Sequence, residues 1–403
     1  MAEIRQYINE NKSSSDDFDE KERRDDFEER IIRHRRRIRI IIICIAVAVI
    51  IGVVAFCLVK RKSVYATYTT ENSVTRKDSS ASEYFKFGDG YVRCSKDGVA
   101  AFSYNGTQLW NKSYEINKTG IDICGSYMVV ADIDGNEVYL FNTDGFVNVI
   151  NTAMPIIQAN VSGQGLVVVS LKDTEATYIN MYDRDGGKLY NIKSTISGDG
   201  VPVSMSVSDD GRKLLVSFVS VKGMEFNTSV VVYNFGEVGQ SANERIVAGY
   251  DTYGSQLVSK VEFISRDIAV AFGENVISFF KVGEYSKLIK DVPVDNKIEK
   301  IFYSSDKVGL IVLDENNNRQ LEVYNTSGDK ILSYKPDENY AFYGFTENNI
   351  IMYSGKKCCI INTKGRELYS ETMEYDISQM ISLGGDKEFL LITAKTIDKI
   401  KFK

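Results

Sequence analysis

A motif that returns about every forty residues constrains the fold of this chain more than any other feature. In each copy an alternating apolar run ends in an aromatic or aliphatic residue, which is followed by a polar residue and then, within a few positions, by a glycine. We call the residues that precede the polar position the marker residues. They are spaced by 37 to 51 residues, and they are Tyr104, Phe141, Tyr182, Tyr233, Phe280, Tyr324 and Ile361. This spacing is the period of a four-stranded blade and predicts a β-propeller.

Each copy also contains the other strands that a blade needs. A second run precedes the marker residue, as in residues 127–131 and 166–171, and it is almost entirely apolar, as a strand buried on both faces must be. A polar-alternating run such as residues 188–193 follows the glycine, which suits an outer strand with one exposed face. The DG, SG and KG turns between these runs supply the positive φ that a tight hairpin requires.

The end of the chain leaves the last blade incomplete. Residues 389–402 supply two more strands, and the chain then stops without an outermost one. A ring cannot leave this gap without exposing strand edges. We therefore predict that residues 64–69 pair with the carboxy-terminal strand and close an all-β propeller of eight blades. A seven-bladed ring is the alternative. A loop at residues 71–82 should follow the closing strand. The predicted closing residues are Val64, Tyr65, Ala66, Thr67, Tyr68 and Thr69.

An uncharged apolar stretch, residues 40–59, precedes the repeats. It is long enough as a helix to cross a hydrocarbon core of roughly 30 Å, so we predict one transmembrane helix. Arginine is concentrated before it, whereas only Lys60, Arg61 and Lys62 follow, and this asymmetry predicts a plasma-membrane protein with a cytoplasmic amino terminus and an extracytoplasmic propeller. A cleaved signal peptide is the competing interpretation, but its apolar core would be only about 7–15 residues long. The topology-setting arginines are Arg33, Arg35, Arg36, Arg37 and Arg39, with Arg30 before them.

These features divide the chain into four parts. Residues 1–39 form a charged cytoplasmic tail, disordered or helical, with too few apolar side chains for a core. Residues 40–59 form the span, residues 60–83 the closing strand and a linker, and residues 84–403 the propeller. The tail is either a docking peptide for a cytoplasmic partner, a basic collar on anionic lipid, or a solvated segment whose arginines set the topology.

The distribution of titratable residues excludes several kinds of site. The only histidine is His34, which precedes the span, so the propeller has no imidazole for a Ser-His-Asp or Cys-His nucleophile, a His-ligated zinc site or an attached c-type haem. Carboxylate, tyrosine and lysine chemistry remains open. The chain carries 49 Lys and Arg against 55 Asp and Glu, and this balance argues against nucleic acid, whose binding normally shows as a basic stripe.

Two acidic turns and two cysteines are candidate sites that we interpret structurally. Residues 132–137, DIDGNE, resemble part of a calcium loop but lack its twelve-residue spacing, so we expect a hairpin turn there and another at residues 314–318. Cys94 and Cys124 could pair in an oxidising compartment; the alternative, which we favour, is two buried apolar residues. We assign no catalytic, cofactor-binding or metal-ligating residue.

The stretch GTQLW, which ends in Trp110, resembles the repeat signature of quinoprotein-type propellers, and Tyr190 in GGKLY and Tyr369 in GRELY occupy the same place. This resemblance implies an eight-bladed ring. The aromatic and charged ligands of a quinone and its calcium cannot be placed on residues of this chain, so no cofactor is expected. The Trp-Asp and Gly-His marks of WD repeats are absent. The whole layout of charged tail, single span and outer propeller is similar to an uncharacterised family of single-pass Gram-positive bacterial membrane proteins that carry a domain of unknown function.

These observations favour a non-enzymatic role. We expect a membrane-anchored scaffold that presents a propeller face to a protein partner in the cell envelope, or to a small-molecule ligand of unknown identity. One alternative is an enzyme of the quinoprotein or carboxylate kind with its site in the central channel. Another is a sensor that couples ligand binding outside to the cytoplasmic tail. A channel lined by apolar and small residues would favour the scaffold, whereas convergent Asp, Glu or Arg would favour the enzyme.

Overall fold

The computed structural model describes residues 38–53, 65–78 and 81–403. The chain divides into two compact units, which are residues 1–64 and residues 65–403. Each unit is described by itself below.

The first unit contains one described helix, which covers residues 38–53 and has exposed side chains. Over the described residues, no helix is both long enough and apolar enough to cross a membrane. The predicted span at residues 40–59 continues beyond the described residues from position 54. The predicted tail lies outside them up to residue 37.

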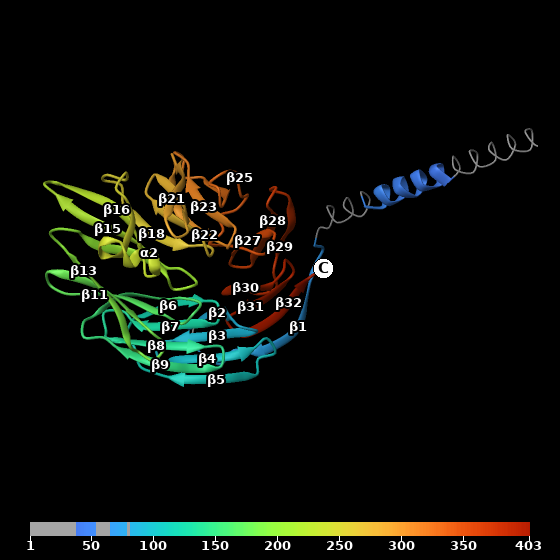
Figure 1. Ribbon diagram of the computed structural model, residues 1–403. Helices are drawn as coiled ribbons and strands as arrows, with labels where there is room; N and C mark the ends of the chain where they lie inside the picture. The colour runs from blue at the N-terminus through green and yellow to red at the C-terminus, as the bar shows by residue number, and fades with distance from the viewer. Residues whose placement is uncertain (1–37, 54–64, 79–80) are drawn as a thin grey trace, which may run out of the picture. The chain divides into compact units, whose positions relative to one another are not determined.

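The second unit is a β-propeller of eight antiparallel sheets, each of four strands (Figure 1). This confirms the all-β class and the eight blades predicted from the repeat. Seven blades consist of four consecutive strands, whereas the eighth takes its outermost strand from the start of the unit. We number the blades one to seven in chain order and call the last one blade eight.

The strands of the first four blades follow one another along the chain. Blade one contains β2 (Glu83–Phe87), β3 (Gly90–Ser95), β4 (Gly98–Ser103) and β5 (Gln108–Ser113). Blade two contains β6 (Thr119–Cys124), β7 (Tyr127–Asp132), β8 (Glu137–Asn142) and β9 (Gly145–Asn151). Blade three contains β10 (Ile156–Val161), β11 (Val167–Lys172), β12 (Ala176–Tyr182) and β13 (Lys188–Thr195). Blade four contains β14 (Val201–Val207), β15 (Lys213–Lys222), β16 (Glu225–Asn234) and β17 (Ile246–Tyr250).

The remaining blades continue this order until the ring closes. Blade five contains β18 (Val258–Phe263), β19 (Ile268–Gly273), β20 (Val276–Val282) and β21 (Ser286–Pro293). Blade six contains β22 (Lys297–Tyr303), β23 (Lys307–Leu313), β24 (Arg319–Asn325) and β25 (Lys330–Tyr334). Blade seven contains β26 (Phe342–Phe345), β27 (Asn349–Ser354), β28 (Lys357–Asn362) and β29 (Glu367–Thr372). Blade eight contains β30 (Gln379–Gly384), β31 (Glu388–Ile392), β32 (Thr396–Phe402) and β1 (Tyr68–Thr75).

The second and third strands of the blades are buried because both of their faces contact neighbouring blades. Val129, Val130 and Ala131 of β7 have no exposed surface. Apolar clusters join adjacent blades, and one of them contains Val92 of blade one together with Met128 of blade two. Full burial of such a side chain contributes about 1.5–3 kcal/mol, so the stability of the ring depends on every pair of neighbouring blades.

The ring is closed by β1, which pairs antiparallel with β32, so that the blue and red strands lie side by side in Figure 1. Tyr68 lies opposite Phe402. Just before the strand, the Ala66 N–H donates to the Lys403 carbonyl over 2.8 Å, and the Lys403 N–H donates to the Thr67 carbonyl over 2.9 Å. The amino-terminal end of the propeller and the last residue of the chain are therefore held together by their backbones.

The closing strand both begins and ends later than the sequence indicated, because residues 65–67 precede it and it covers Tyr68–Thr75. We predicted a loop from residue 71, but β1 continues to Thr75, which pairs with Thr396, so the prediction is wrong for residues 71–75. These residues are polar, and their strand conformation depends on partners in β32. Glu71 lies 2.8 Å from the Lys399 ammonium, and the Ser73 hydroxyl donates to the Asp398 carboxylate over 2.5 Å. An outer strand with one wet face carries little local hydrophobic signal.

The two ends of the ring can be distinguished by the alternation of turns in an antiparallel sheet. The turns between first and second strands, and those between third and fourth strands, lie at one end together with residues 65–67 and Lys403. We call this end the terminal face. The connections between second and third strands, and those between blades, lie at the other end, which we call the distal face.

Blade four departs from the other blades at both ends. Its strands β15 and β16 have ten residues each, and their hairpin projects beyond β14 and β17 at the distal face. At the terminal face residues 235–245 join β16 to β17 and contain the short helix α2 (Glu237–Gln240) and the 3-10 helix η1 (Asn243–Arg245). Residues 283–285 make the same connection in blade five. The two additions explain the longer spacing of the repeat on either side of Tyr233.

Candidate functional site

The first strand of each blade of a propeller lines the central channel. First strands of several neighbouring blades contact one another here, among them β6 with β10 and β14 with β18. Glutamine side chains join two of these pairs. The Gln158 amide of β10 donates to the Met205 carbonyl over 2.9 Å and accepts from the Met205 N–H over 3.1 Å. Gln379 of β30 makes the same pair of bonds with the backbone of Tyr84 in β2, at 2.7 and 3.3 Å. We call such side-chain-to-backbone contacts inter-blade staples.

Asp122 of β6 makes a staple of the same kind. Its Oδ2 accepts from the Val161 N–H over 2.8 Å and from the Asn160 amide over 3.2 Å, both on β10. Burial raises the pKa of Asp122, and these hydrogen bonds offset part of the rise. The carboxyl therefore joins blades two and three, as Gln158 joins blades three and four.

A cavity of 290 Å³ opens where the channel meets the terminal face. Asp122, Cys124, Asp209, Glu262 and Arg266 line it and come from blades two, four and five. The Cys124 thiol donates to the Asp209 carboxylate over 3.6 Å. Burial, together with the charge of Asp209, raises the pKa of Cys124 to about 12. The thiol therefore stays protonated near neutral pH, whereas a nucleophilic cysteine reacts as its thiolate.

Lys260 and Glu262 of β18 form a charged group with Tyr303 of β22 in the channel. The Lys260 ammonium lies 3.5 Å from Glu262 Oε2 and donates to the Tyr303 hydroxyl over 3.0 Å. Burial raises the pKa of Glu262, the Lys260 charge lowers it, and the charge of Asp122 raises it further, so that the net shift is upward. Two carboxyls with raised pKa values thus line one cavity, and the channel mouth is not apolar.

Replacing Glu262 by Gln should stabilise the propeller near neutral pH. The raised pKa means that folding disfavours the ionised carboxylate, so the wild-type protein loses stability as pH rises above about 4.3, the ordinary pKa of glutamate in an unfolded chain. The melting temperature of Glu262→Gln should therefore exceed that of the wild type at pH 7, and the difference should shrink as the pH approaches 4. Thermal unfolding of both proteins across this range measures it. A difference that grows on acidification contradicts the assignment.

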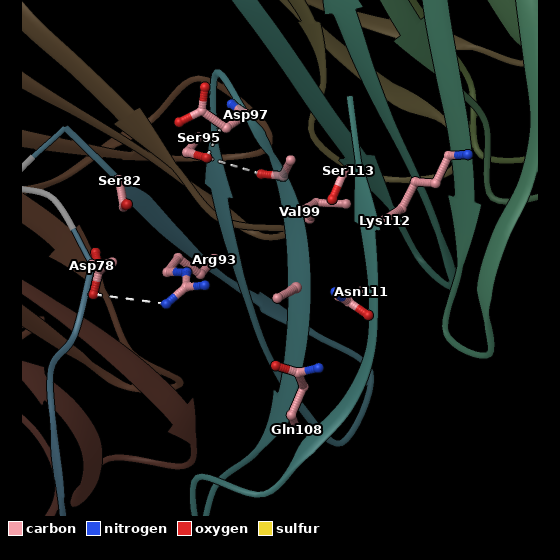
Figure 2. Close-up of a pocket in the computed structure, with 12 residues that line it drawn as sticks. Asp78, Ser82, Arg93, Ser95, Asp97, Val99, Gln108, Asn111, Lys112 and Ser113 are labelled. Atoms are coloured by element: carbon pink, nitrogen blue, oxygen red, sulfur yellow. Dashed lines mark hydrogen bonds and ion pairs between the residues drawn. The ribbon is translucent and has the colours of Figure 1, made fainter. Parts of the chain in front are cut away.

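A second cavity, of 330 Å³, lies on the side of blade one that faces the segment after β1 (Figure 2). Its floor consists of two cross-strand rows, which are Arg93, Ala100 and Asn111, and Ser95, Gly98 and Ser113. Figure 2 shows the Arg93 guanidinium turned toward the Asp78 carboxylate, and the two groups are 3.9 Å apart. The cavity is polar, and its principal charges face each other.

Asp78 belongs to a buried network that joins blades eight and one, which we call the closing network. Arg76 donates to Asp78 through Nε and Nη2 at 3.2 Å, and the two side chains are only 6% and 7% exposed. The Tyr84 hydroxyl of blade one donates to Asp78 over 2.7 Å, while Arg76 Nη1 donates to the Thr393 carbonyl of blade eight over 3.1 Å. Arg76 and Asp78, which follow the closing strand, therefore form hydrogen bonds with both blade eight and blade one.

The structure places the predicted closing residues at the seam of the ring. Tyr68 and Thr69 are the first residues of β1, and Thr69 pairs with Lys401. Tyr65 precedes the strand, is buried, and donates its N–H to the Leu368 carbonyl of blade seven over 2.6 Å. Ala66 and Thr67 bond to Lys403, as described above. Val64 lies outside the described residues.

Of the topology-setting arginines, Arg39 lies exposed on the helix of the first unit. The others lie outside the described residues, and they are Arg33, Arg35, Arg36 and Arg37.

The aromatic residue of the quinoprotein-like motif packs adjacent blades together. The Trp110 indole of blade one stacks on Phe141 of blade two, with ring centroids 5.6 Å apart, and its N–H donates to the Thr143 carbonyl over 3.0 Å. Tyr190 likewise stacks on Phe235 of blade four, whereas Tyr369 meets Phe402 of blade eight edge to face. The aromatic residue of each of these three stretches therefore packs against the next blade.

The acidic turns close hairpins. Asp132 accepts from the Asn117 N–H over 3.0 Å, and Asp314 accepts from the N–H groups of Asn316 and Asn318. In the described part of the chain, no three His, Cys, Asp or Glu side chains are grouped as a metal site. Cys94 is a buried free thiol and Cys124 a half-buried one, so the pairing considered from the sequence does not form in this structure.

Sequence reasoning missed the residues that join the blades. Asp122 and Gln158 are polar residues inside the mostly apolar first strands TGIDIC and IIQANV, and this contrast could have identified them. Arg76 and Asp78 lie in a segment predicted as a loop and carry no periodic signal.

Similarity to one solved structure, that of Chaetomium thermophilum Sqt1, supports the fold. Chaetomium thermophilum Sqt1, in a structure bound to the N-terminus of the ribosomal protein L10, is similar over 85% of this chain and 100% of its own, with a TM-score of 0.51 and 10% identity. The WD40 domain of Neurospora crassa Pan2 is similar over 83% of this chain and 95% of its own, with a TM-score of 0.42 and 10% identity. Raptor of Chaetomium thermophilum is similar over 85% of this chain, which spans 29% of Raptor, with a TM-score of 0.47 and 10% identity.

Comparison with curated proteins finds no match. One family does match, over residues 60–402, and it is described as a family of unknown function, DUF5711. The match includes every strand of the propeller. The chain therefore belongs to the DUF5711 family.

Proposed function

We propose that this protein is a membrane-anchored scaffold whose extracytoplasmic propeller binds a protein partner of the cell envelope. The observation that carries the proposal is the β15–β16 hairpin, which projects from blade four. Val221, Met224 and Phe226 at its tip are 70%, 104% and 41% exposed, and Val221 lies opposite Phe226 across the hairpin. Apolar side chains grouped in solvent mark interaction surfaces, so the tip fits an apolar groove on another protein.

The hairpin tip and the start of the propeller lie at opposite ends of the ring. Residues 65–67, from which the chain continues toward the apolar stretch, lie on the terminal face, whereas the hairpin lies on the distal face. A partner bound at the tip would therefore not contact residues 65–67, where the chain enters the propeller. Sqt1, a propeller of the same fold, binds the N-terminus of a ribosomal protein, which supports a peptide segment as one element that such a ring can recognise.

The anchor can be tested by protease accessibility in intact cells. We expect protease added outside to remove an epitope tag fused to the carboxy terminus and to spare a tag fused to the amino terminus, because the apolar stretch and the arginines before it predict opposite sides of the membrane. Lysed cells, in which both tags should be cleaved, provide the control. Protection of both tags in intact cells contradicts the proposed topology.

Serine substitutions at the hairpin tip should abolish partner binding without unfolding the ring. The triple variant Val221→Ser, Met224→Ser and Phe226→Ser removes exposed side chains, so its melting temperature should stay within about 2 °C of the wild type. Crosslinking in intact membranes followed by mass spectrometry measures binding, and the triple variant should no longer capture the proteins that the wild type captures. A matched control, Leu189→Ser with Leu288→Ser, removes exposed apolar residues from outer strands and should retain them. Identical captures by triple variant and wild type contradict the proposal.

A carboxylate-based enzyme is the second candidate, because Asp122, Glu262 and Arg266 converge on the channel mouth, which is the arrangement that we expected of an enzyme. A pair of carboxyls with suitable spacing can hydrolyse glycosidic bonds. The engagement of Asp122 as a staple weighs against this role. Incubating the full chain with cell-wall glycan fragments decides between them. Cleavage that is lost in Glu262→Gln favours the enzyme, and no cleavage by either protein favours the scaffold.

A further inference from the structure

A third cavity, of 610 Å³, lies between blades four and five on the terminal face, at the opposite end of blade four from the hairpin tip. Its wall combines the β14–β15 turn and the start of the insertion at residues 235–245 with the β18–β19 and β20–β21 turns of blade five. Arg266 lines both this cavity and the channel mouth, so the two form adjacent parts of one surface. The insertion that distinguishes blade four thus contributes directly to the cavity.

Three cationic side chains that line the cavity have unused hydrogen-bonding capacity. The Lys213 side chain is only 10% exposed, and in the described part of the chain the one acceptor near its ammonium is Asp267 Oδ1, at 3.5 Å. An ammonium has three donors, and a buried lysine is normally paired. The guanidinium groups of Arg212 and Arg266 are exposed and form no ion pair or hydrogen bond with a described residue, although the charges of Arg212 and Lys213 help to lower the pKa of the neighbouring Asp210. These donors are available to an anionic group in the cavity.

The acidic residues of the same wall limit what that anion can be. Asp210 accepts from the Ser208 hydroxyl over 2.6 Å and from the Arg212 backbone N–H over 3.1 Å, so it is committed to its own turn. Glu237 and Glu284 are exposed at the rim, and with Asp210 and Asp267 they outnumber the three cations. The carboxylates would repel a polyanion or a dianionic phosphate strongly. A single carboxylate placed among the cations carries less charge and would be repelled less.

We propose that this cavity binds a glutamate or aspartate side chain from an extended peptide segment of the partner protein, with Lys213, Arg212 and Arg266 as its ligands. The inference rests on the proposed function, since it takes the partner to be a protein. It assigns a second contact at the other end of blade four from the hairpin tip. Specificity comes from the mixed charge of the wall, which favours a single acidic side chain flanked by neutral or basic ones.

Selection of random heptapeptides displayed on phage against the full chain tests this assignment. We expect the selected peptides to share one acidic position, and a Glu→Gln change there to weaken binding by roughly tenfold, as expected for one charge-assisted hydrogen-bond pair. Arg266→Gln and Arg212→Gln should each weaken binding of the acidic peptide by a similar factor. Neither substitution should change much the affinity for the peptide in which Gln replaces Glu. Fluorescence anisotropy of labelled peptides measures each affinity, which should also fall with added salt.

Two further variants keep the test independent of folding. Lys213→Met retains the volume of a buried side chain and should also lose the preference for Glu over Gln; its melting temperature shows whether it is folded. Lys364→Gln removes an exposed lysine from a turn of blade seven on the same face and should leave binding unchanged.

Three results would overturn the assignment. The first is a selection without any preference for an acidic position. The second is an acidic peptide that binds the arginine variants as tightly as it binds the wild type. The third is tighter binding when phosphoserine replaces the glutamate, which would identify a phosphate site. None of these results affects the hairpin experiment, which tests residues on the distal face. The scaffold function could therefore stand while this site fails, and the reverse outcome is equally distinguishable.

Discussion

Removal of residues 1–75 should lower the melting temperature of the propeller by about 10 °C relative to removal of residues 1–64. The longer deletion eliminates β1 and leaves β32 as an unpaired outer edge. At about 1 kcal/mol net for each lost backbone hydrogen bond, a ladder of this length contributes on the order of 5 kcal/mol. The exposed edge should also promote self-association, because an unpaired strand is a template for another chain.

The shorter deletion is the matched control, because it retains Tyr65 and every described residue of the propeller. Differential scanning calorimetry measures the melting temperatures, and light scattering measures association. Equal melting temperatures for the two fragments would show that blade eight is stable without its outermost strand. The closing role of β1 would then be excluded.

Replacement of Asp78 by Asn should destabilise the propeller by about 3 kcal/mol or more, because it removes the negative charge that lies 3.2 Å from the buried Arg76 guanidinium. The side chains of Arg76 and Asp78 are almost fully buried, so solvent cannot compensate for the missing charge. Chemical denaturation of the full chain measures the change in the free energy of unfolding. The double variant Arg76→Met with Asp78→Leu removes both charges and should be less destabilised than Asp78→Asn. A double variant that is equally or more destabilised contradicts the argument.

The effect of Asp78→Asn should depend on pH. Burial alone would raise the pKa of Asp78, but hydrogen bonds from Arg76, Tyr84 and Ser82 outweigh it and hold the pKa below its usual value. Because the folded-state pKa is the lower one, the stabilisation is complete above the unfolded value of about 3.9 and is lost as pH falls through the folded value. The difference between wild type and variant should therefore be constant near neutral pH and shrink below pH 4. A difference that is already falling between pH 7 and pH 5 would contradict this sign.

The blades were predictable because their signals are local. Alternation along a strand and a glycine at a hairpin depend on residues only a few positions apart, and seven marker residues were enough to place the repeat. The extent of β1 was not predictable, since Glu71 and Ser73 become strand residues through partners more than three hundred positions away. A polar outer strand has no apolar pattern of its own from which to read its end.

The candidate sites were less accessible from the sequence than the fold. The absence of histidine from the propeller is a property of the sequence alone, and it excludes whole classes of chemistry. The sequence could not show that Asp122 joins two blades. It also could not show that Glu262, which comes from blade five, lines the same cavity as Asp122. Nor could it show that Lys213 is buried between blades four and five, because burial there depends on the insertion after β16 and on the turns of the next blade.

The sequence by itself determined the period, the all-β class and the need for a strand to close the ring, because these follow from side-chain alternation and from the cost of an open edge. Tertiary structure alone decided which polar residues hold neighbouring blades, where β1 ends, and which cations line a cavity. Those properties depend on contacts between segments that the ring brings together from distant parts of the chain, and no local pattern records them.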